Sequence, residues 1–131
     1  MQSWIFVITA AYDEFKDRIN KKAWPIYKNT GNKRKLRVGD NVIFYMGGPE
    51  GKKFLGTSRV DSDLIPNSID FSIGLSDIKI WKKPVLIKDI LADLKFIVHK
   101  EKWGLHLQGG IIRLSDGDFK TIISNAKKSD V

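Results

Sequence analysis

The sequence contains no cysteine, which excludes disulfide bonds, thiolate metal ligands and a cysteine nucleophile. Histidine is scarce too, since His99 and His106 are the only two in 131 residues. A metal site that catalyses a reaction needs at least three converging ligands, so we expect neither a metal nor another cofactor. The lack of cysteine is compatible with a reducing compartment, and we expect a cytoplasmic protein.

Several longer patterns are also missing. The apolar run Trp4–Ile8 is far too short to cross a bilayer, and no basic segment precedes it as in a signal peptide. The phosphate-loop pattern G-x-x-x-x-G-K-[ST] and the G-x-S-x-G nucleophile elbow do not occur. The sequence therefore gives no reason to expect a membrane protein, an ATPase or a serine hydrolase.

Positive charge is unevenly distributed. The formal net charge is +8, yet the segment from residue 21 to residue 37 has no acidic residue and the rest of the chain is nearly neutral. A local basic field attracts phosphate groups, so a polyanionic partner such as nucleic acid is favoured over an acidic small molecule. The basic residues of this segment are Lys21, Lys22, Lys28, Lys33, Arg34, Lys35 and Arg37.

The order of apolar and polar residues predicts more strands than helices. Strands are expected in segments 3–10, 41–46, 52–63 and 110–115, a strand pair in 68–84, and helices in 11–22, 85–97 and 115–128. Two hairpins without β-α-β alternation are typical of a mostly antiparallel barrel with about three helices, which is an α+β fold. We expect one domain over residues 1–131, with a frayed tail from about residue 126.

Two tryptophans lie in segments that the sequence predicts to be loops flanked by lysine, Trp24 after the first helix and Trp103 near the histidines. A large ring in such a place either covers the edge of the core, the more frequent explanation for a single tryptophan, or faces a ligand. In a basic surface the ring can stack on a base, which is worth about 1–3 kcal/mol per base. Both explanations remain open.

The stretch LQGGIIRLS is the second informative segment. Gly109 and Gly110 allow a close approach of the backbone to a ligand, and Gln108 offers a donor and an acceptor suited to the edge of a base. A plain glycine turn with a surface glutamine is the alternative. Arg113 is expected to point away from Ile112 and Leu114, toward an acidic side chain or a phosphate.

The segments WIFVIT, AWPIYKN, RVGDNVIFYMGG, FLGTSRVDSD and LKFIVHKEKWGLHLQGGIIRLSDGDF occur in this order. With these segments in this order, the chain resembles the EVE domain family, a branch of the PUA-like superfamily related to YTH and ASCH domains. The resemblance covers essentially the whole chain, and the last segment is the most specific. It implies a PUA-like pseudobarrel with a pocket that receives one base, often a modified one, flipped out of its strand.

The resemblance also implies which residues form the pocket. Trp24 takes the place of the stacking wall, followed by Pro25. Many EVE domains have Lys-Ser-Glu-Pro where this chain has Ile8-Thr9-Ala10-Ala11, which implies an altered base specificity. The remaining residues implied at the pocket are Thr9, Ala10, Trp103, Gln108, Gly109 and Gly110, with Tyr12 and Phe71 as candidates for a second aromatic wall.

Three functions follow as hypotheses. In the first, the protein binds RNA or DNA, captures one base, and holds phosphates with its basic segment and Arg113; its oligomeric state is open, with a monomer favoured. In the second, it is a hydrolase of modified nucleosides, as some ASCH relatives are, with Asp13, Glu14 and His106 as candidate acids or bases. In the third, it is an adaptor whose basic segment binds an acidic protein. The first is favoured.

Overall fold

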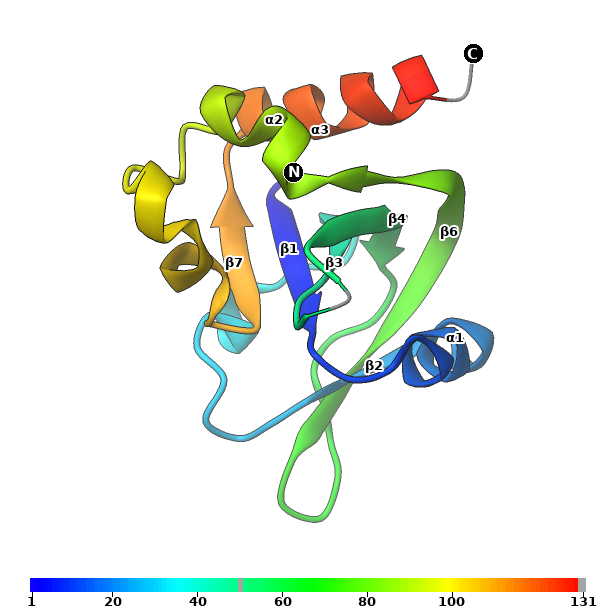
Figure 1. The fold of residues 1–131 in the computed structure, drawn as a ribbon. Coiled ribbons are helices and arrows are strands. Elements are labelled where there is room, and N and C mark those ends of the chain that lie inside the picture. The colour runs from blue at the N-terminus through cyan, green and yellow to red at the C-terminus, as the bar shows by residue number, and fades with distance from the viewer. Residues whose placement is uncertain (50, 130–131) are drawn as a thin grey trace.

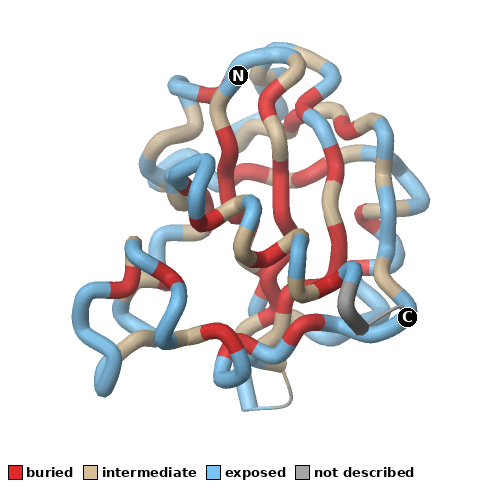
Figure 2. The backbone as a smooth tube through the Cα atoms, turned by 90° about the horizontal axis from the view of Figure 1, so that it is seen from above, coloured by how far each residue is buried: buried red, intermediate tan, exposed pale blue. Residues whose placement is uncertain are grey.

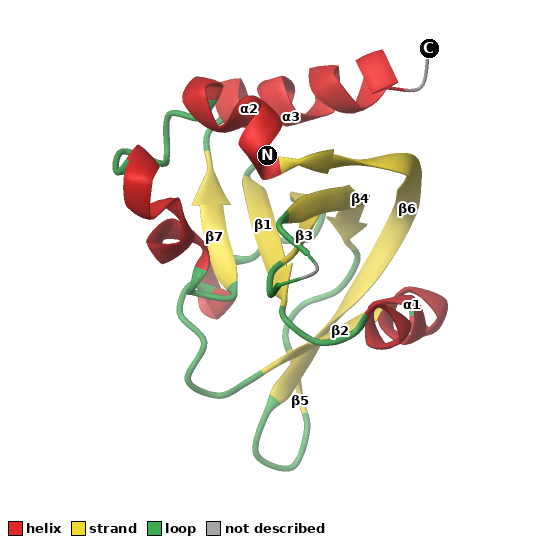
Figure 3. Cartoon of the chain, viewed as in Figure 1, coloured by secondary structure: helices red, strands yellow, loops and turns green. Residues whose placement is uncertain are grey.

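The computed structural model describes residues 1–49 and 51–129. Its strands form one curled sheet in the order β2-β6-β4-β3-β1-β7, and β5 pairs with β6 beside this path (Figures 1 and 3). The strands are β1 (Ser3–Ile8), β2 (Ala23–Ile26), β3 (Asn41–Met46), β4 (Lys53–Val60), β5 (Ile65–Pro66), β6 (Phe71–Leu86) and β7 (Ile111–Leu114). The helices are α1 (Tyr12–Lys21), α2 (Ile87–Ile90) and α3 (Asp116–Ser129), with 3₁₀ turns η1 (Lys33–Lys35), η2 (Leu91–Asp93) and η3 (Lys100–Leu107).

Most strand pairs are antiparallel, and β1 with β3 is a parallel pair. This confirms the predicted α+β fold, a mostly antiparallel PUA-like pseudobarrel decorated by helices. Parallel strands end at the same edge of a sheet, so the chain leaves β1 at Ile8 and β3 at Met46 side by side. The candidate functional site lies at this edge.

Strand β1 is buried on both of its faces, as its unbroken run of aromatic and β-branched residues predicts. Trp4, Phe6 and Ile8 point into the curl of the sheet, where they pack with Phe15 of α1 and Phe44 of β3. Ile5 points to the other face, which α2 and α3 cover (Figure 1). Strand β1 lies between β3 and β7, one place from the edge of the sheet. Figure 2 shows the buried strands at the centre of the molecule.

Two segments differ from their predicted structure. Residues 71–86 form one long strand instead of a strand pair, with residues 71–74 bonded to β2 and the part from residue 75 to residue 86 bonded to β4. The predicted helix 85–97 is reduced to α2 and η2, because Val85 and Leu86 still belong to β6. Helix α3 extends to Ser129 and buries Ala126, where the sequence predicts the beginning of a frayed tail; residues 130 and 131 lie outside the described residues.

Candidate functional site

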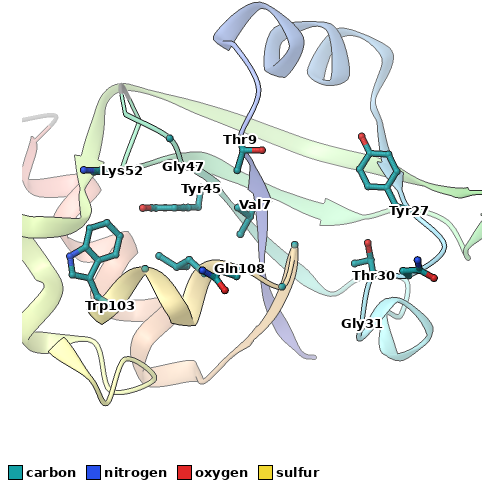
Figure 4. A pocket seen from close by; sticks show the side chains of 16 residues that line it. Val7, Thr9, Tyr27, Thr30, Gly31, Tyr45, Gly47, Lys52, Trp103 and Gln108 are labelled. Carbon is teal, nitrogen blue, oxygen red and sulfur yellow. The ribbon is translucent and has the colours of Figure 1, made fainter. Parts of the chain in front are cut away.

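A groove of about 790 Å³ opens where the ends of β1 and β3 meet the loop after β2 and the helix η3. Figure 4 shows Trp103 and Lys52 at one end of it and Tyr27 and Thr30 at the other, with Val7, Tyr45 and Gln108 between them. This volume falls in the range of about 300–1,000 Å³ that is usual for ligand sites. The groove is lined by Val7, Thr9, Tyr27, Asn29, Thr30, Gly31, Tyr45, Gly47, Gly48, Lys52, Trp103, Gly104, Leu107, Gln108, Gly109 and Gly110.

A smaller hollow of about 170 Å³ adjoins the groove, between β1, β2 and α1. It has walls from Glu14 and Arg18 of α1, from Trp24 and Pro25 of β2, and from Ala10. The groove and the hollow share the lining residues Val7, Thr9, Tyr27, Thr30 and Gly110. The two cavities are therefore neighbours with common walls, and we refer to them together as the depression.

Backbone hydrogen bonds hold three chain segments together at this edge. The amide of Val7 donates to the carbonyl of Gly110, and the amide of Gly47 donates to the carbonyl of Ile8, each at 2.8 Å. Asn32 donates from its side chain to the carbonyl of Ile111 at 2.9 Å and so fixes the loop after β2 against β7. Gly110 has a φ of +78°, a conformation that glycine adopts without steric strain.

The structure distributes the predicted pocket residues over this depression. Trp103, Gln108 and Gly109 line the groove; Ala10, Trp24 and Pro25 line the hollow; Thr9 and Gly110 line both. Tyr12 and Phe71, the candidates for a second aromatic wall, line neither cavity. Tyr12 instead lines a third cavity next to Ala10 and packs on Phe15, and Phe71 pairs with Ile26 across β2 and β6.

The prediction that Trp24 lies in a loop is wrong. It belongs to strand β2, is only 2% exposed and packs in the aromatic core. Its ring stacks on Phe44 at 5.2 Å and lies near the rings of Phe6 and Phe15. The sequence did not reveal the strand because Pro25 follows, although proline is tolerated on an edge strand such as β2. Trp24 thus contributes to the core and also forms a wall of the hollow.

Arg18 is a site residue that the sequence analysis missed. Its guanidinium carbon lies 4.6 Å from the centre of the Trp24 ring, and its Nη2 donates to Glu14 Oε1 at 2.9 Å. Arginine stacks favourably on aromatic faces. A signal was present in the sequence, because Arg18 follows the inward-facing Phe15 by three residues and therefore lies on the buried side of α1.

Trp103 and Gln108 are carried by the segment that leads to β7. Trp103 is half-buried in the kinked helix η3, and Gln108 follows its end with the side chain exposed. The sequence predicted a loop here. Asp118 of α3 anchors the start of this segment, since its carboxylate accepts hydrogen bonds from the amides of Lys95 at 2.8 Å and Phe96 at 2.9 Å.

Tyr45 contributes to the floor of the groove from strand β3. Its side chain is buried beside Phe54, in the core on the face of the sheet that α2 and α3 cover. Desolvation by burial raises the pKa of Tyr45 to about 12, because a phenolate loses hydration in an apolar surrounding. The hydroxyl therefore stays protonated at neutral pH and remains a hydrogen-bond donor.

Some of the residues predicted to contact phosphate are engaged within the protein. Lys33 donates from Nζ to the carbonyls of Lys28 and Thr30, and Arg37 donates to the carbonyls of Arg34 and Leu36. The other internal contacts are Lys21 with Asp17, Arg34 over Phe71, and Arg113 with Gln2 and over Trp4. Lys22, Lys28 and Lys35 have exposed side chains, and Lys28 lies between two residues of the groove.

The candidates for a metal site or for acid-base chemistry do not converge. Among the described residues, no group of three or more His, Asp or Glu side chains is placed to hold a metal ion. His99 and His106 stack on each other at 5.8 Å, and the amide of His99 donates to Nε2 of His106. Glu14 lines the hollow, whereas neither Asp13 nor His106 lines the groove or the hollow.

The curled sheet, with its cavity at the ends of the parallel β1 and β3, defines a PUA-like domain. Within this class, the family model of the EVE domain matches residues 2–125. The chain belongs to the EVE domain family, as the sequence motifs predicted. In the part of the chain that the structure describes, no helix is long and apolar enough to cross a membrane.

Solved structures share the fold at low sequence identity. The protein Rpa0253 from Rhodopseudomonas palustris is 14% identical with a TM-score of 0.74, and the match covers 98% of this chain and 94% of that one. Human THYN1, solved in complex with DNA containing 5-methylcytosine, is 11% identical with a TM-score of 0.70, covering 97% and 98%. The MmI1 YTH domain is 14% identical with a TM-score of 0.70, covering 99% and 98%. The comparison with curated proteins finds no match.

Proposed function

We propose that this protein is a nucleic-acid-binding domain that captures a single nucleobase, with a modified base as the expected target. The single-stranded nucleic acid lies in the groove, and the captured base enters the adjoining hollow beside Trp24. The basic segment from residue 21 to residue 37 holds the neighbouring phosphates. We place this activity in the cytoplasm on the compositional grounds given above.

The observation that carries the proposal is that a small hollow adjoins a larger groove and shares walls with it. The hollow is below the usual size of a ligand site, so it suits one planar ring system and leaves a sugar and its phosphate outside. The groove next to it is large enough for those groups and offers Trp103 and Tyr27 for stacking neighbouring bases. An exposed ring beside basic side chains is the usual arrangement for binding single strands.

The relatives support the same proposal. THYN1 was solved with DNA that contains 5-methylcytosine, and a YTH domain has the same fold. Extruding a base from a duplex costs roughly a few kcal/mol, and the cost is least for a base that is unpaired or single-stranded. We therefore expect single strands to bind more tightly than duplexes of the same sequence.

Fluorescence anisotropy with labelled oligonucleotides, modified bases included, tests the proposal. Trp103→Ala removes a stacking surface of the groove and leaves the aromatic core around Trp24 unchanged. We expect the Kd for the oligonucleotide to rise about 5- to 150-fold. Leu105→Ala is the matched control, because Leu105 lies on the same helix, is exposed and does not line the groove. Melting temperatures of both variants verify that the fold is kept.

Equal affinity of the wild type and of Trp103→Ala would contradict the proposal. Capture of an acidic protein that persists after nuclease treatment, with no oligonucleotide binding, would favour the adaptor instead. Release of free base or modified products from a nucleoside panel, detected by mass spectrometry, would favour the hydrolase.

A further inference from the structure

Arg18 is an unusual cation for a small domain because it is 8% exposed and lies in the wall of a cavity. One of its guanidinium nitrogens, Nη2, is bonded to Glu14. The Nε atom is buried and has no hydrogen-bond partner, and it is the one such side-chain atom found among the described residues. A buried donor without a partner costs about 1–3 kcal/mol, so such a group calls for a specific explanation.

The surroundings of Arg18 favour a neutral acceptor as the missing partner. Glu14 already compensates the positive charge of the guanidinium at 2.9 Å. An anionic group such as a phosphate would approach the Glu14 carboxylate as well, and like charges repel. A carbonyl oxygen on an uncharged ring accepts a hydrogen bond without this repulsion.

The same geometry argues against an aromatic cage around the captured base. Phe44 stacks on the Trp24 ring, and the Arg18 guanidinium lies over it. A base that stacked on the centre of Trp24 would have to displace Arg18 from Glu14. A base that enters the hollow without displacing Arg18 meets this residue on the wall instead.

We propose, as a deepening of the proposed function and resting on it, that Arg18 determines which base the hollow accepts. It donates its Nε–H, which is covered until the base enters the hollow, to a ring carbonyl oxygen of the captured base. The hollow therefore selects a base that has a carbonyl group on its buried edge, such as a 6-oxopurine, and rejects one with an amino group there. An amino group in the same position would place donor against donor and leave Arg18 without a partner.

Adenine and hypoxanthine provide a matched pair of probes, because at C6 adenine has an amino group where hypoxanthine has a carbonyl. The experiment compares a short all-adenine single strand with the same strand containing one central hypoxanthine, in ribo and deoxy forms. We expect the wild type to bind the hypoxanthine strand about tenfold more tightly or better. In Arg18→Met, which keeps the length of the side chain but removes its donors, the ratio of the two affinities should fall toward one.

Arg59→Met is the control, since Arg59 is exposed on β4 and pairs with Asp77 away from the cavities; its affinity ratio should equal that of the wild type. The ratio of the wild-type affinities for the hypoxanthine and adenine oligonucleotides tests the base preference even if Arg18→Met does not fold. Equal affinity for both oligonucleotides, or a preference for adenine, would overturn the role of Arg18. In that case, binding of either oligonucleotide that still depends on Trp103 would uphold the proposed function. Failure of both strands to bind would overturn both.

Discussion

At the scale of single residues, Asp40 ties the turn before β3 to the start of β1. Its carboxylate accepts hydrogen bonds from Trp4 Nε1 at 2.9 Å, from the amide of Arg37 at 3.0 Å, and from the amide and side chain of Gln2 at 3.2 and 3.0 Å. The residue is 3% exposed. A buried charge with several donors stabilises a fold only while the charge is present.

These bonds make stability depend on pH. Desolvation by burial raises the pKa of Asp40, but the donors outweigh it and lower the pKa below its ordinary value of 3.8. An acid whose pKa is lower in the folded than in the unfolded state stabilises the fold above the unfolded pKa, and this contribution is lost as the pH falls through the folded pKa. The melting temperature should therefore drop as the pH is lowered past 3.8.

Asp40→Asn isolates this contribution. The neutral amide keeps one oxygen but turns its NH₂ group toward a donor, so we expect the free energy of unfolding in urea at neutral pH to fall by about 1.5–3 kcal/mol. As the pH falls below 3.8 and through the lower pKa of the folded state, the difference between wild type and variant should shrink, because Asp40 then becomes protonated in the folded wild type as well. A constant difference at every pH would contradict this account.

The candidate site shows which residues a sequence reveals. Gln108, Gly109 and Gly110 could be proposed from their types alone, since a double glycine next to a glutamine suggests a backbone open to a ligand. The spacing of Arg18 from Phe15 indicates that it is buried, but its place in the site could not be proposed, because that depends on Trp24 of β2 lying beside α1. A pairing between strands far apart in sequence leaves no local pattern.

At the scale of elements, β4 and β6 approach each other closely at Gly56. A Cβ atom there would lie 2.1 Å from the carbonyl oxygen of Lys79 and 2.9 Å from Cα of Ile80. The register of the two strands shifts at the same point. Glycine inside a strand often marks such a close approach of two backbones.

We expect Gly56→Ala to lower the free energy of unfolding by about 1–3 kcal/mol or more, because the backbones must separate to accommodate the methyl group. Gly117→Ala in α3 is the control, since its nearest neighbour would be Ser115 Oγ at 4.0 Å. Alanine favours a helix, so this control should be neutral or stabilise by up to about 1 kcal/mol. If Gly56→Ala and Gly117→Ala changed the free energy of unfolding equally in chemical denaturation, the close approach of β4 and β6 would be contradicted.

The segment that carries Trp103 depends on α3 through Asp118, which is 1% exposed. Asp118→Ala leaves two amides without their acceptor, and we expect a loss of about 2–3 kcal/mol in stability. Hydrogen exchange at Lys95 and Phe96 should accelerate while exchange at Phe44 in β3 stays slow. Asp116→Ala, on an exposed residue of the same helical turn, should leave exchange at both amides unchanged.

The elements that the sequence predicted well are those with a strong local pattern. Strand β1 and helix α1 were confirmed because a dense apolar run and a four-residue spacing are each specific to one structure. The length of β6 was missed because apolar and polar residues alternate along it as in a pair of shorter strands. In the structure it is one continuous strand that pairs with β2 and then with β4. The 3₁₀ turns around Trp103 have too few residues for a period to emerge.

At the scale of the whole molecule, most of the excess positive charge lies on the segment from residue 21 to residue 37. After β2 this segment runs from the groove past β7 toward the start of β1. Asn32 bonds to Ile111, and the carbonyl of Lys35 accepts a bond from Gln2. Lys28 and Lys35 are exposed on this segment. Such an arrangement holds a strand through its phosphates and contributes little to the choice of base.

Binding should therefore weaken with salt. For a single strand, each neutralised phosphate contributes about 0.7 to the slope of log affinity against log salt. Lys28→Ala and Lys35→Ala should each reduce the slope by about this amount, whereas Lys120→Ala on α3 should not change it. A wild-type affinity that does not vary with salt would exclude phosphate contacts.

Capture of a base in the depression is tested by an amide NMR titration of the ¹⁵N-labelled protein with a short single strand that contains all four bases. We expect the largest shifts on residues of the groove and the hollow, including Thr9, Thr30, Gln108 and Gly110, while α3 is unaffected. Shifts confined to α3 and the outer face of β6, or no shifts at a large excess of oligonucleotide, would contradict it.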